Sequence, residues 1–170
     1  HGVVNSHFST ESGMLMDEAI MNVILEKYHI RIGRKAAETL KMALGVEWDL
    51  NRDTRICEVC GISTITELPV KIAVTGEIVA QALNPILYRI FSGITSVIQM
   101  TPPAILGDIR EHGIVLIGGV AQLKGLNELV LKVTDMKAHV ADHPSYVNAV
   151  GAGSALEYMD YFRDSLQDLH

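Results

Sequence analysis

The sequence has few cysteines and no long uninterrupted apolar segment. Cys57 and Cys60 are the only two cysteines among 170 residues, so the disulfide framework of a small secreted domain is excluded. Arg, Glu, Pro or Gly interrupts every apolar run before it reaches the roughly 20 residues that a membrane-spanning helix requires. The first residues also lack the basic-then-apolar pattern of a signal peptide. These absences lead us to expect a cytoplasmic protein.

Basic residues are in the minority as well. Fourteen Lys and Arg against twenty Asp and Glu give a net charge of -6, and the seven His form no run. Proteins that bind nucleic acid usually carry a basic stripe that neutralises phosphates, so nucleic acid is not an expected partner. A hydrophobic content of 48% with 20% charged residues is typical of a globular chain rather than a disordered one. The length suits one domain, or one lobe of a larger molecule.

The spacing of apolar residues predicts an α/β chain. Helical periodicity predicts helices over residues 14–28, 34–44, 77–99, 104–111, 126–134 and 149–166. Short runs rich in β-branched residues predict strands over 2–8, 55–62, 67–74, 114–117 and 138–140. The runs 55–62 and 67–74 are joined by a short turn and indicate an antiparallel pair. Alternation of strands and helices in the last third indicates a covered, partly parallel sheet, and Pro85 and Gly93 predict a kink or break in the longest helix.

A pair of glycines directly after the apolar run 114–117 is the sharpest local feature. Glycines at the end of a buried strand allow a ligand to approach the backbone closely, because no Cβ intervenes and positive φ is accessible. A tight turn without a ligand explains Gly118 and Gly119 equally well. The segment is not a P-loop, since no Gly-Lys-Ser/Thr ending follows.

Six segments in chain order make the glycine pair more specific. They are Met16-Asp17-Glu18-Ala19-Ile20, Ile32-Gly33-Arg34-Lys35-Ala36-Ala37-Glu38-Thr39-Leu40-Lys41, Glu67-Leu68-Pro69, Thr101-Pro102-Pro103-Ala104, Gly113-Ile114-Val115-Leu116-Ile117-Gly118-Gly119 and Val140-Ala141-Asp142-His143-Pro144. This series resembles MreB, the bacterial actin that sets rod cell shape, over nearly the whole chain, but covers only the C-terminal half of that family. The resemblance implies an α/β fold: an actin-like (ribonuclease H-like) ATPase lobe with subdomains IIA and IIB only. Residues 1–11 and 100–170 would form the IIA-like part, and residues 12–99 the IIB-like insertion.

The resemblance also implies a nucleotide site. The family's Glu-x-x-Lys motif, which contacts the ribose and adenine, matches Glu38, Thr39, Leu40 and Lys41. Residues three apart share a helix face, so a carboxylate could accept from sugar hydroxyls while an ammonium lies beside the base. Without the resemblance, a solvated ion pair within the helix would be the simpler interpretation.

The family's Gly-Gly-Gly-Ala loop matches Gly118, Gly119, Val120 and Ala121. The third glycine is therefore valine, and we expect its β-branched side chain to disfavour positive φ and to add bulk near the ligand, weakening ATP binding. The family binds Mg-ATP through phosphate loops and metal ligands in its N-terminal half. The 170 residues alone are therefore not expected to hydrolyse ATP.

Partners follow from the same resemblance. It implies self-association into cytoskeletal filaments that control cell shape, in which subdomain IIB of one subunit docks on IIA of the next, together with other cell-shape proteins. No direct membrane contact is implied for this half. One alternative is a divergent or truncated module without ATPase activity that regulates or caps MreB-type filaments. Another is a lobe of a chaperone-type or sugar-kinase ATPase, but the chaperones' Gly-Gly-Ser-Thr-Arg loop is absent.

Three weaker constellations are expected to be structural. Cys57 and Cys60 lie three apart in a predicted strand, where they face opposite sides, and no second ligand pair follows. His139 and His143 could share a metal only on a helix, and the surrounding sequence predicts a strand and a turn. Asp17 and Glu18 lie near the start of a predicted helix and are expected to complement its dipole.

Overall fold

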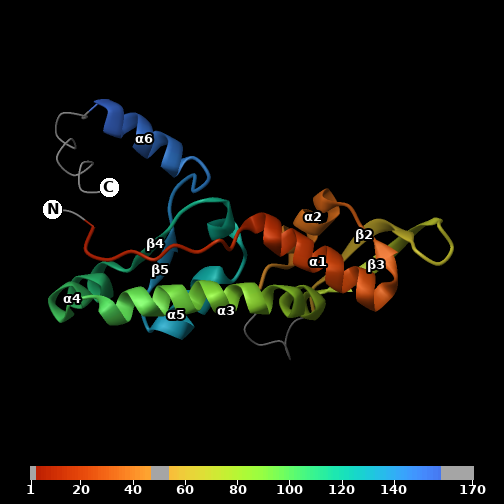
Figure 1. The fold of residues 1–170 in the computed structure, drawn as a ribbon, viewed down its shortest axis with the longest axis horizontal. Coiled ribbons are helices and arrows are strands. Elements are labelled where there is room, and N and C mark those ends of the chain that lie inside the picture. Colours follow the sequence, from red (N-terminus) through yellow and green to blue (C-terminus); the bar gives the residue numbers. More distant parts are fainter. Residues whose placement is uncertain (1–2, 47–53, 158–170) are drawn as a thin grey trace.

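The computed structural model describes residues 3–46 and 54–157, which form an α/β arrangement (Figure 1). The helices are α1 (Gly13–Tyr28), α2 (Arg34–Leu44), α3 (Gly76–Met100), α4 (Pro103–His112), the short 3-10 helix η2 (Gly119–Gln122), α5 (Leu126–Thr134) and α6 (Val147–Glu157). The strands are β1 (Ile30–Arg31), β2 (Ile56–Ser63), β3 (Pro69–Thr75), β4 (Ile114–Leu116) and β5 (Ala138–Val140). The bounds of most of these elements lie within two residues of the predicted ones, whereas β1 was not predicted. The predicted final helix is seen to Glu157, and its remainder lies outside the described residues.

Two separate sheets form within the described residues. Strands β1, β2 and β3 make an antiparallel sheet in that order, with Ile56 opposite Thr75 and Ile62 opposite Pro69. Strands β4 and β5 make a parallel pair, with Ile114 beside Ala138. The predicted antiparallel hairpin and the predicted parallel pairing are therefore both confirmed.

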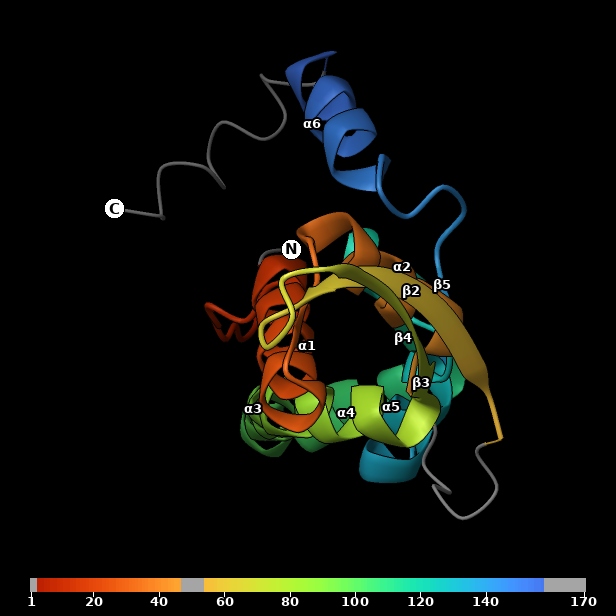
Figure 2. The ribbon, with the colours of Figure 1, turned by 90° about the vertical axis from the view of Figure 1, so that its right-hand side faces the viewer.

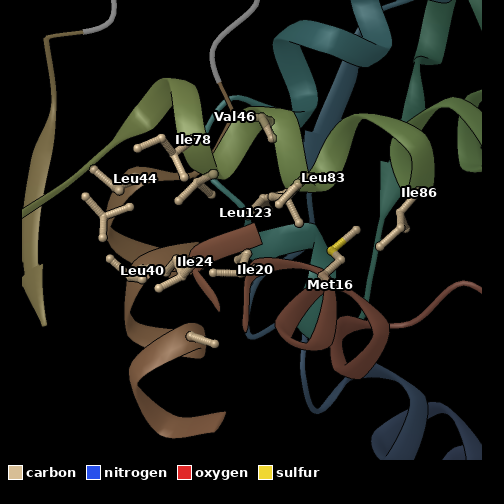
Figure 3. Packing of buried hydrophobic residues seen from close by; sticks show 14 of the residues in the cluster. Met16, Ile20, Ile24, Leu40, Leu44, Val46, Ile78, Leu83, Ile86 and Leu123 are labelled. Carbon is tan, nitrogen blue, oxygen red and sulfur yellow. The ribbon is translucent and has the colours of Figure 1, made fainter. Parts of the chain in front are cut away.

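One hydrophobic core joins α1, α2, α3 and the inner face of the antiparallel sheet (Figure 3). Met16, Ile20 and Ile24 recur every four residues along α1, so they line one face of that helix and are completely or almost completely buried. Leu40 of α2 and Leu83 of α3 pack into the same cluster. Ser12 caps α1 by accepting a hydrogen bond from the Leu15 amide at 3.3 Å. The core therefore fixes α1 and α2 against each other.

Helix α3 runs without interruption although Pro85 lies inside it. Of the expected kink or break, the break does not occur. Leu83, Ile86 and Leu87, on both sides of the proline, are buried in the core and hold the helix in place. Packing of this apolar face outweighs the hydrogen bond that the proline removes.

The segment before α1 forms no strand, contrary to the prediction for residues 2–8, of which 3–8 are described. It runs extended beside α3 instead (Figure 1). The His7 ring occupies the space where a Cβ on Gly93 would lie, and Glu11 forms a two-pronged ion pair with Arg89, with Nη2 and Oε2 3.1 Å apart. Contact with the helix has taken the place of the strand pairing that β-branched residues favour.

The parallel pair is less covered than its sequence predicted. Residues 114–117 were expected to form a buried strand, but Val115 is 56% exposed and Ile117 is 46% exposed. Leu116 points the other way and packs against the core. Only one face of β4 therefore has a partner among the described residues.

Candidate functional site

A pocket of about 500 Å³ opens where α1, α2 and the segment after β4 meet. Its size falls within the range of small-molecule sites. It is lined by the N-terminal end of α1, by the middle of α2, by η2 and by a residue that follows β5. The lining residues are Ser12, Gly13, Met14, Met16, Asp17, Glu38, Lys41, Met42, Gly119, Val120, Gln122, Leu123 and Ser145.

Four of the eight predicted site residues therefore meet in one pocket: Glu38, Lys41, Gly119 and Val120. Glu38 is exposed at the pocket wall, with its carboxylate available to a ligand. Thr39 points elsewhere, since its hydroxyl donates to the Lys35 carbonyl at 2.8 Å. Leu40 is fully buried in the core. The helical repeat explains this division, because only the first and fourth positions of the motif share the pocket face.

Lys41 does not project freely into the pocket. Its Nζ lies 2.7 Å from Oδ1 of Asp17 and donates to the Gly13 carbonyl at 2.9 Å. The side chains of Lys41 and Asp17 are only 10% and 7% exposed. A charge buried this deeply requires a partner, and each of these two groups supplies the other's. The pair connects α2 to the beginning of α1 at the base of the pocket.

The sequence suggested that Asp17 and Glu18 complement the dipole of α1. In the structure each of them instead pairs with a cation of α2. Glu18 pairs with Arg34 at 3.1 Å on the surface, where both side chains are more than half exposed. Asp17 is buried beside the apolar face of α1 and reaches Lys41. Its position between Met16 and Ile20 was the available signal, because a carboxylate adjacent to a core stripe needs a buried counter-charge.

The glycine pair begins η2 after β4. Gly118 has a φ of 85°, which favours glycine, and its amide donates to the Pro144 carbonyl at 2.8 Å. Val120 lies within η2 and has no positive φ, so the expected backbone strain at this residue is absent. The bulk of its side chain remains at the pocket wall. Ala121 is buried and does not line the pocket.

Sequence reasoning missed two polar residues on the far side of the pocket. Gln122 donates through Nε2 to the Ser145 hydroxyl at 2.6 Å, linking η2 to the segment after β5. Neither residue belongs to the matched motifs. No local pattern pointed to them, since they meet only through the fold.

Two hydrogen bonds, one between backbone groups and one from a side chain, hold the parts of the pocket together. The Val46 amide donates to the Lys124 carbonyl at 2.8 Å, directly after α2 and directly before α5. Lys124 in turn donates through Nζ to the Ala43 carbonyl at 3.3 Å. A Cβ on Gly125 would lie 2.0 Å from the Val46 carbonyl oxygen, so the two chains touch without room for a side chain. The end of α2 and the segment after η2 are thereby fixed relative to each other.

The cysteine pair and the histidine pair are not arranged as a metal site would require. Cys57 packs partly against the core while Cys60 is exposed on the opposite face of β2. His139 lies in β5 and His143 in a turn with a φ of 49°. Across residues 3–46 and 54–157, no three His, Cys, Asp or Glu side chains gather as a metal site would require. Nor does that part of the chain contain a helix long and apolar enough to cross a membrane.

Comparison with known proteins agrees with this architecture. The chain is 31% identical over 158 residues to the cell shape-determining protein Mbl of Bacillus cereus, covering 93% of this chain and 47% of that protein. It is 32% identical over 160 residues to the cell shape-determining protein MreB of Escherichia coli, covering 94% and 46%. The chain thus spans about half the length of these relatives.

Solved structures show the same fold. MreB5 of Spiroplasma citri bound to ADP superposes with a TM-score of 0.79 at 22% identity, covering 89% of this chain and 46% of that one. The MamK double helical filament superposes with a TM-score of 0.67 at 21% identity, covering 81% and 42%. The fold is therefore that of an actin-like lobe. Because the sequence model described as MreB/Mbl protein matches residues 1–164, the chain belongs to the MreB/Mbl family.

Proposed function

We propose that this chain supplies the adenosine side of an ATP site in an MreB-like cytoskeletal protein. Residues 1–11 and 100–170 act as the IIA-like part, and residues 12–99 as the IIB-like insertion. The observation that carries the proposal is the pocket itself. It joins Glu38 of α2 to Gly119 and Val120 of η2, which are far apart in the sequence.

The chemistry of the lining fits a nucleoside better than a triphosphate. Glu38 offers a carboxylate that can accept from two ribose hydroxyls, and the exposed Gly119 leaves the backbone open to a flat base. Among the described residues of the lining, Lys41 is the only Lys or Arg, and its charge is already paired with that of Asp17. Phosphates and the magnesium ion would therefore be bound by residues outside this chain's pocket. Magnesium would polarise the phosphoryl oxygens there.

The proposal can be tested by adding ATP, and separately adenosine, to the isotope-labelled chain and following the amide NMR signals. We expect shifts in α2 and η2, and a roughly tenfold weaker affinity for Glu38→Gln, because a charge-assisted hydrogen bond contributes about 1.5–3 kcal/mol. Glu58→Gln is the matched control, since Glu58 is an exposed carboxylate of β2 that does not line the pocket. Saturating ligand that leaves the signals of α2 and η2 unchanged would contradict the proposal.

Val120 provides a second test of the same site. Its Cγ2 lies 3.6 Å from the position of a Cβ on Gly13, so the valine fills part of the space between η2 and α1. Val120→Gly should enlarge this space and tighten nucleotide binding. Unchanged affinity, measured with the chain mixed with the complementary half of an MreB relative, would count against placing the base beside η2.

Filament formation is the second part of the proposal. We infer that the chain contributes polymer contacts to a cytoplasmic filament that takes part in cell-shape control, as its family membership suggests. The alternative is a module that caps or regulates filaments formed by complete relatives. Val120, which adds bulk at the pocket wall, motivates it. Co-sedimentation with Escherichia coli MreB separates the two. Incorporation along the polymer supports a filament subunit, whereas shorter filaments at substoichiometric amounts support a cap.

A further inference from the structure

A side-chain amide and a hydroxyl meet in the wall of the pocket beside η2. Gln122 of η2 donates through Nε2 to Oγ of Ser145 at 2.6 Å, and both residues line the pocket. Ser145 lies in the segment that leads from β5 to α6 (Figure 2). The Gly118 amide donates to the Pro144 carbonyl at 2.8 Å, so the same two segments are also joined through the backbone. We call Gln122 and Ser145 the amide–hydroxyl pair.

The amide–hydroxyl pair is anchored in the fold and yet open to a ligand. Ala121 and Leu123, on either side of Gln122, are 4% and 3% exposed, so the backbone of η2 is fixed at this point. Gln122 and Ser145 themselves are exposed. Gln122 acts as the donor in their hydrogen bond, which leaves its carbonyl oxygen Oε1 to accept a hydrogen bond from a ligand.

The other polar side chains of the described lining are engaged elsewhere. Ser12 caps α1 by accepting from the Leu15 amide at 3.3 Å, and Asp17 and Lys41 pair with each other at 2.7 Å. Glu38 is the carboxylate that the proposed function assigns to the ribose hydroxyls. The rest of the described lining is glycine or apolar, and it contacts the flat face of any purine equally well. The amide–hydroxyl pair is therefore the part of the wall that can distinguish one base edge from another.

We propose that the amide–hydroxyl pair selects a purine with an exocyclic amino group, as in adenosine, over one with an oxo group at the same carbon, as in inosine. This inference rests on the proposed function and names the residues that set its base specificity. Oε1 of Gln122 accepts from the amino group, whereas an oxo group would bring two acceptor oxygens together. Glutamine reads adenine through its amide in nucleic acids as well. Ser145 is a positioning residue, because by accepting from Nε2 it keeps Oε1 free for the base.

Adenosine and inosine are the test ligands, because they share the ribose and differ only at this edge of the base. Each is titrated into the isotope-labelled chain, and its dissociation constant is taken from the amide NMR shifts of α2 and η2. We expect adenosine to bind roughly tenfold more tightly, since inosine loses one hydrogen bond and leaves an acceptor unpaired. The side-chain amide signals of Gln122 should shift with adenosine; their absence from the spectrum of Gln122→Leu identifies them.

Substitutions in the pair should remove the preference without abolishing nucleoside binding. Gln122→Leu should bring the two dissociation constants within about twofold of each other, mainly by weakening adenosine, because leucine lacks Oε1. Ser145→Ala should reduce the preference too, since the amide loses the partner that orients it. Gln81→Leu is the matched control: Gln81 is exposed in α3 and does not line the pocket, so the preference should remain. The ratio is taken within each variant, so partial unfolding affects both ligands alike.

The outcomes separate this inference from the proposed function. Equal affinities for adenosine and inosine in the unchanged chain, or a preference that persists in Gln122→Leu, would overturn the role of the pair and leave the nucleoside pocket in place. Tighter binding of inosine would also overturn it, because the amide would then face the base through Nε2. If neither nucleoside shifted the signals of α2 and η2 at millimolar concentration, the proposed function would fail, and this inference with it.

Discussion

Replacing Asp17 by asparagine would leave the Lys41 ammonium buried without its counter-charge. The two atoms of the pair are 2.7 Å apart, and neither side chain is more than 10% exposed. Breaking a buried pair by removing one partner typically costs about 3–5 kcal/mol. We expect Asp17→Asn and Lys41→Met each to lower the free energy of unfolding by about 3 kcal/mol, with the Gly13 carbonyl retaining one hydrogen bond to Lys41 in the first variant.

The double variant should be more stable than the sum of the single changes predicts. Asp17→Leu combined with Lys41→Met removes both charges and fills similar space with apolar atoms, which is often nearly neutral. We therefore expect a coupling energy of roughly 2 kcal/mol or more between the two positions. Urea unfolding followed by circular dichroism at pH 7 and low temperature, applied to the unchanged chain, Asp17→Leu, Lys41→Met and their combination, measures all terms of the cycle.

The surface pair on the same two helices provides the control. Glu18 and Arg34 are 3.1 Å apart but 51% and 57% exposed, so Glu18→Gln should cost at most about 1 kcal/mol. A coupling energy below about 0.5 kcal/mol between Asp17 and Lys41 would refute the reasoning. So would a cost for Glu18→Gln as large as that for Asp17→Asn.

Two further changes test other contacts. Gly125→Ala should lower the unfolding free energy by more than about 3 kcal/mol, because the new Cβ would clash with the Val46 carbonyl and because the φ of 82° disfavours a side chain. Gly107→Ala in α4, where nothing lies within 4 Å of the new Cβ, should instead be neutral or stabilising. Thermal unfolding of both variants measures the difference. The hydrogen bonds from Arg89 lower the pKa of Glu11, so the pair stabilises the fold above the usual carboxyl pKa and loses this effect as the pH falls through the lowered value. Arg89→Gln should therefore reduce stability at pH 7 and flatten its decline in acid urea titrations; an unchanged acid limb would contradict this assignment.

Most elements of the fold could be predicted because their sequences are locally consistent. Helix α2 ends at Leu44, directly before Gly45, and its apolar residues lie on one face, so both its bounds and its buried side were evident. The hairpin of β2 and β3 was equally clear from its β-branched runs. The segment before α1 was misassigned because strand formation depends on a neighbouring strand, and the described chain offers α3 instead.

The site was only partly predictable for a related reason. The spacing of Glu38 and Lys41 predicted that they lie on one face of α2. It could not predict that the Lys41 ammonium pairs with the Asp17 carboxylate. Val120 was expected to strain the backbone, yet the positive φ falls on Gly118. For Lys41 the deciding partner comes from a different helix, which periodicity along one segment cannot reveal.

The contacts that build the pocket separate its shape from its affinity. The pair between Asp17 and Lys41, and the contact at Gly125, join the pocket walls through buried groups. Glu38 lies on the exposed wall, so we expect it to contribute little to folding. Changes at Gly125 should therefore reduce stability and nucleotide binding together, whereas Glu38→Gln should reduce binding at unchanged stability. If both variants lost binding and stability in the same proportion, the shape of the pocket would depend on Glu38 as well. The distinction between residues that shape the pocket and residues that bind the ligand would then be wrong.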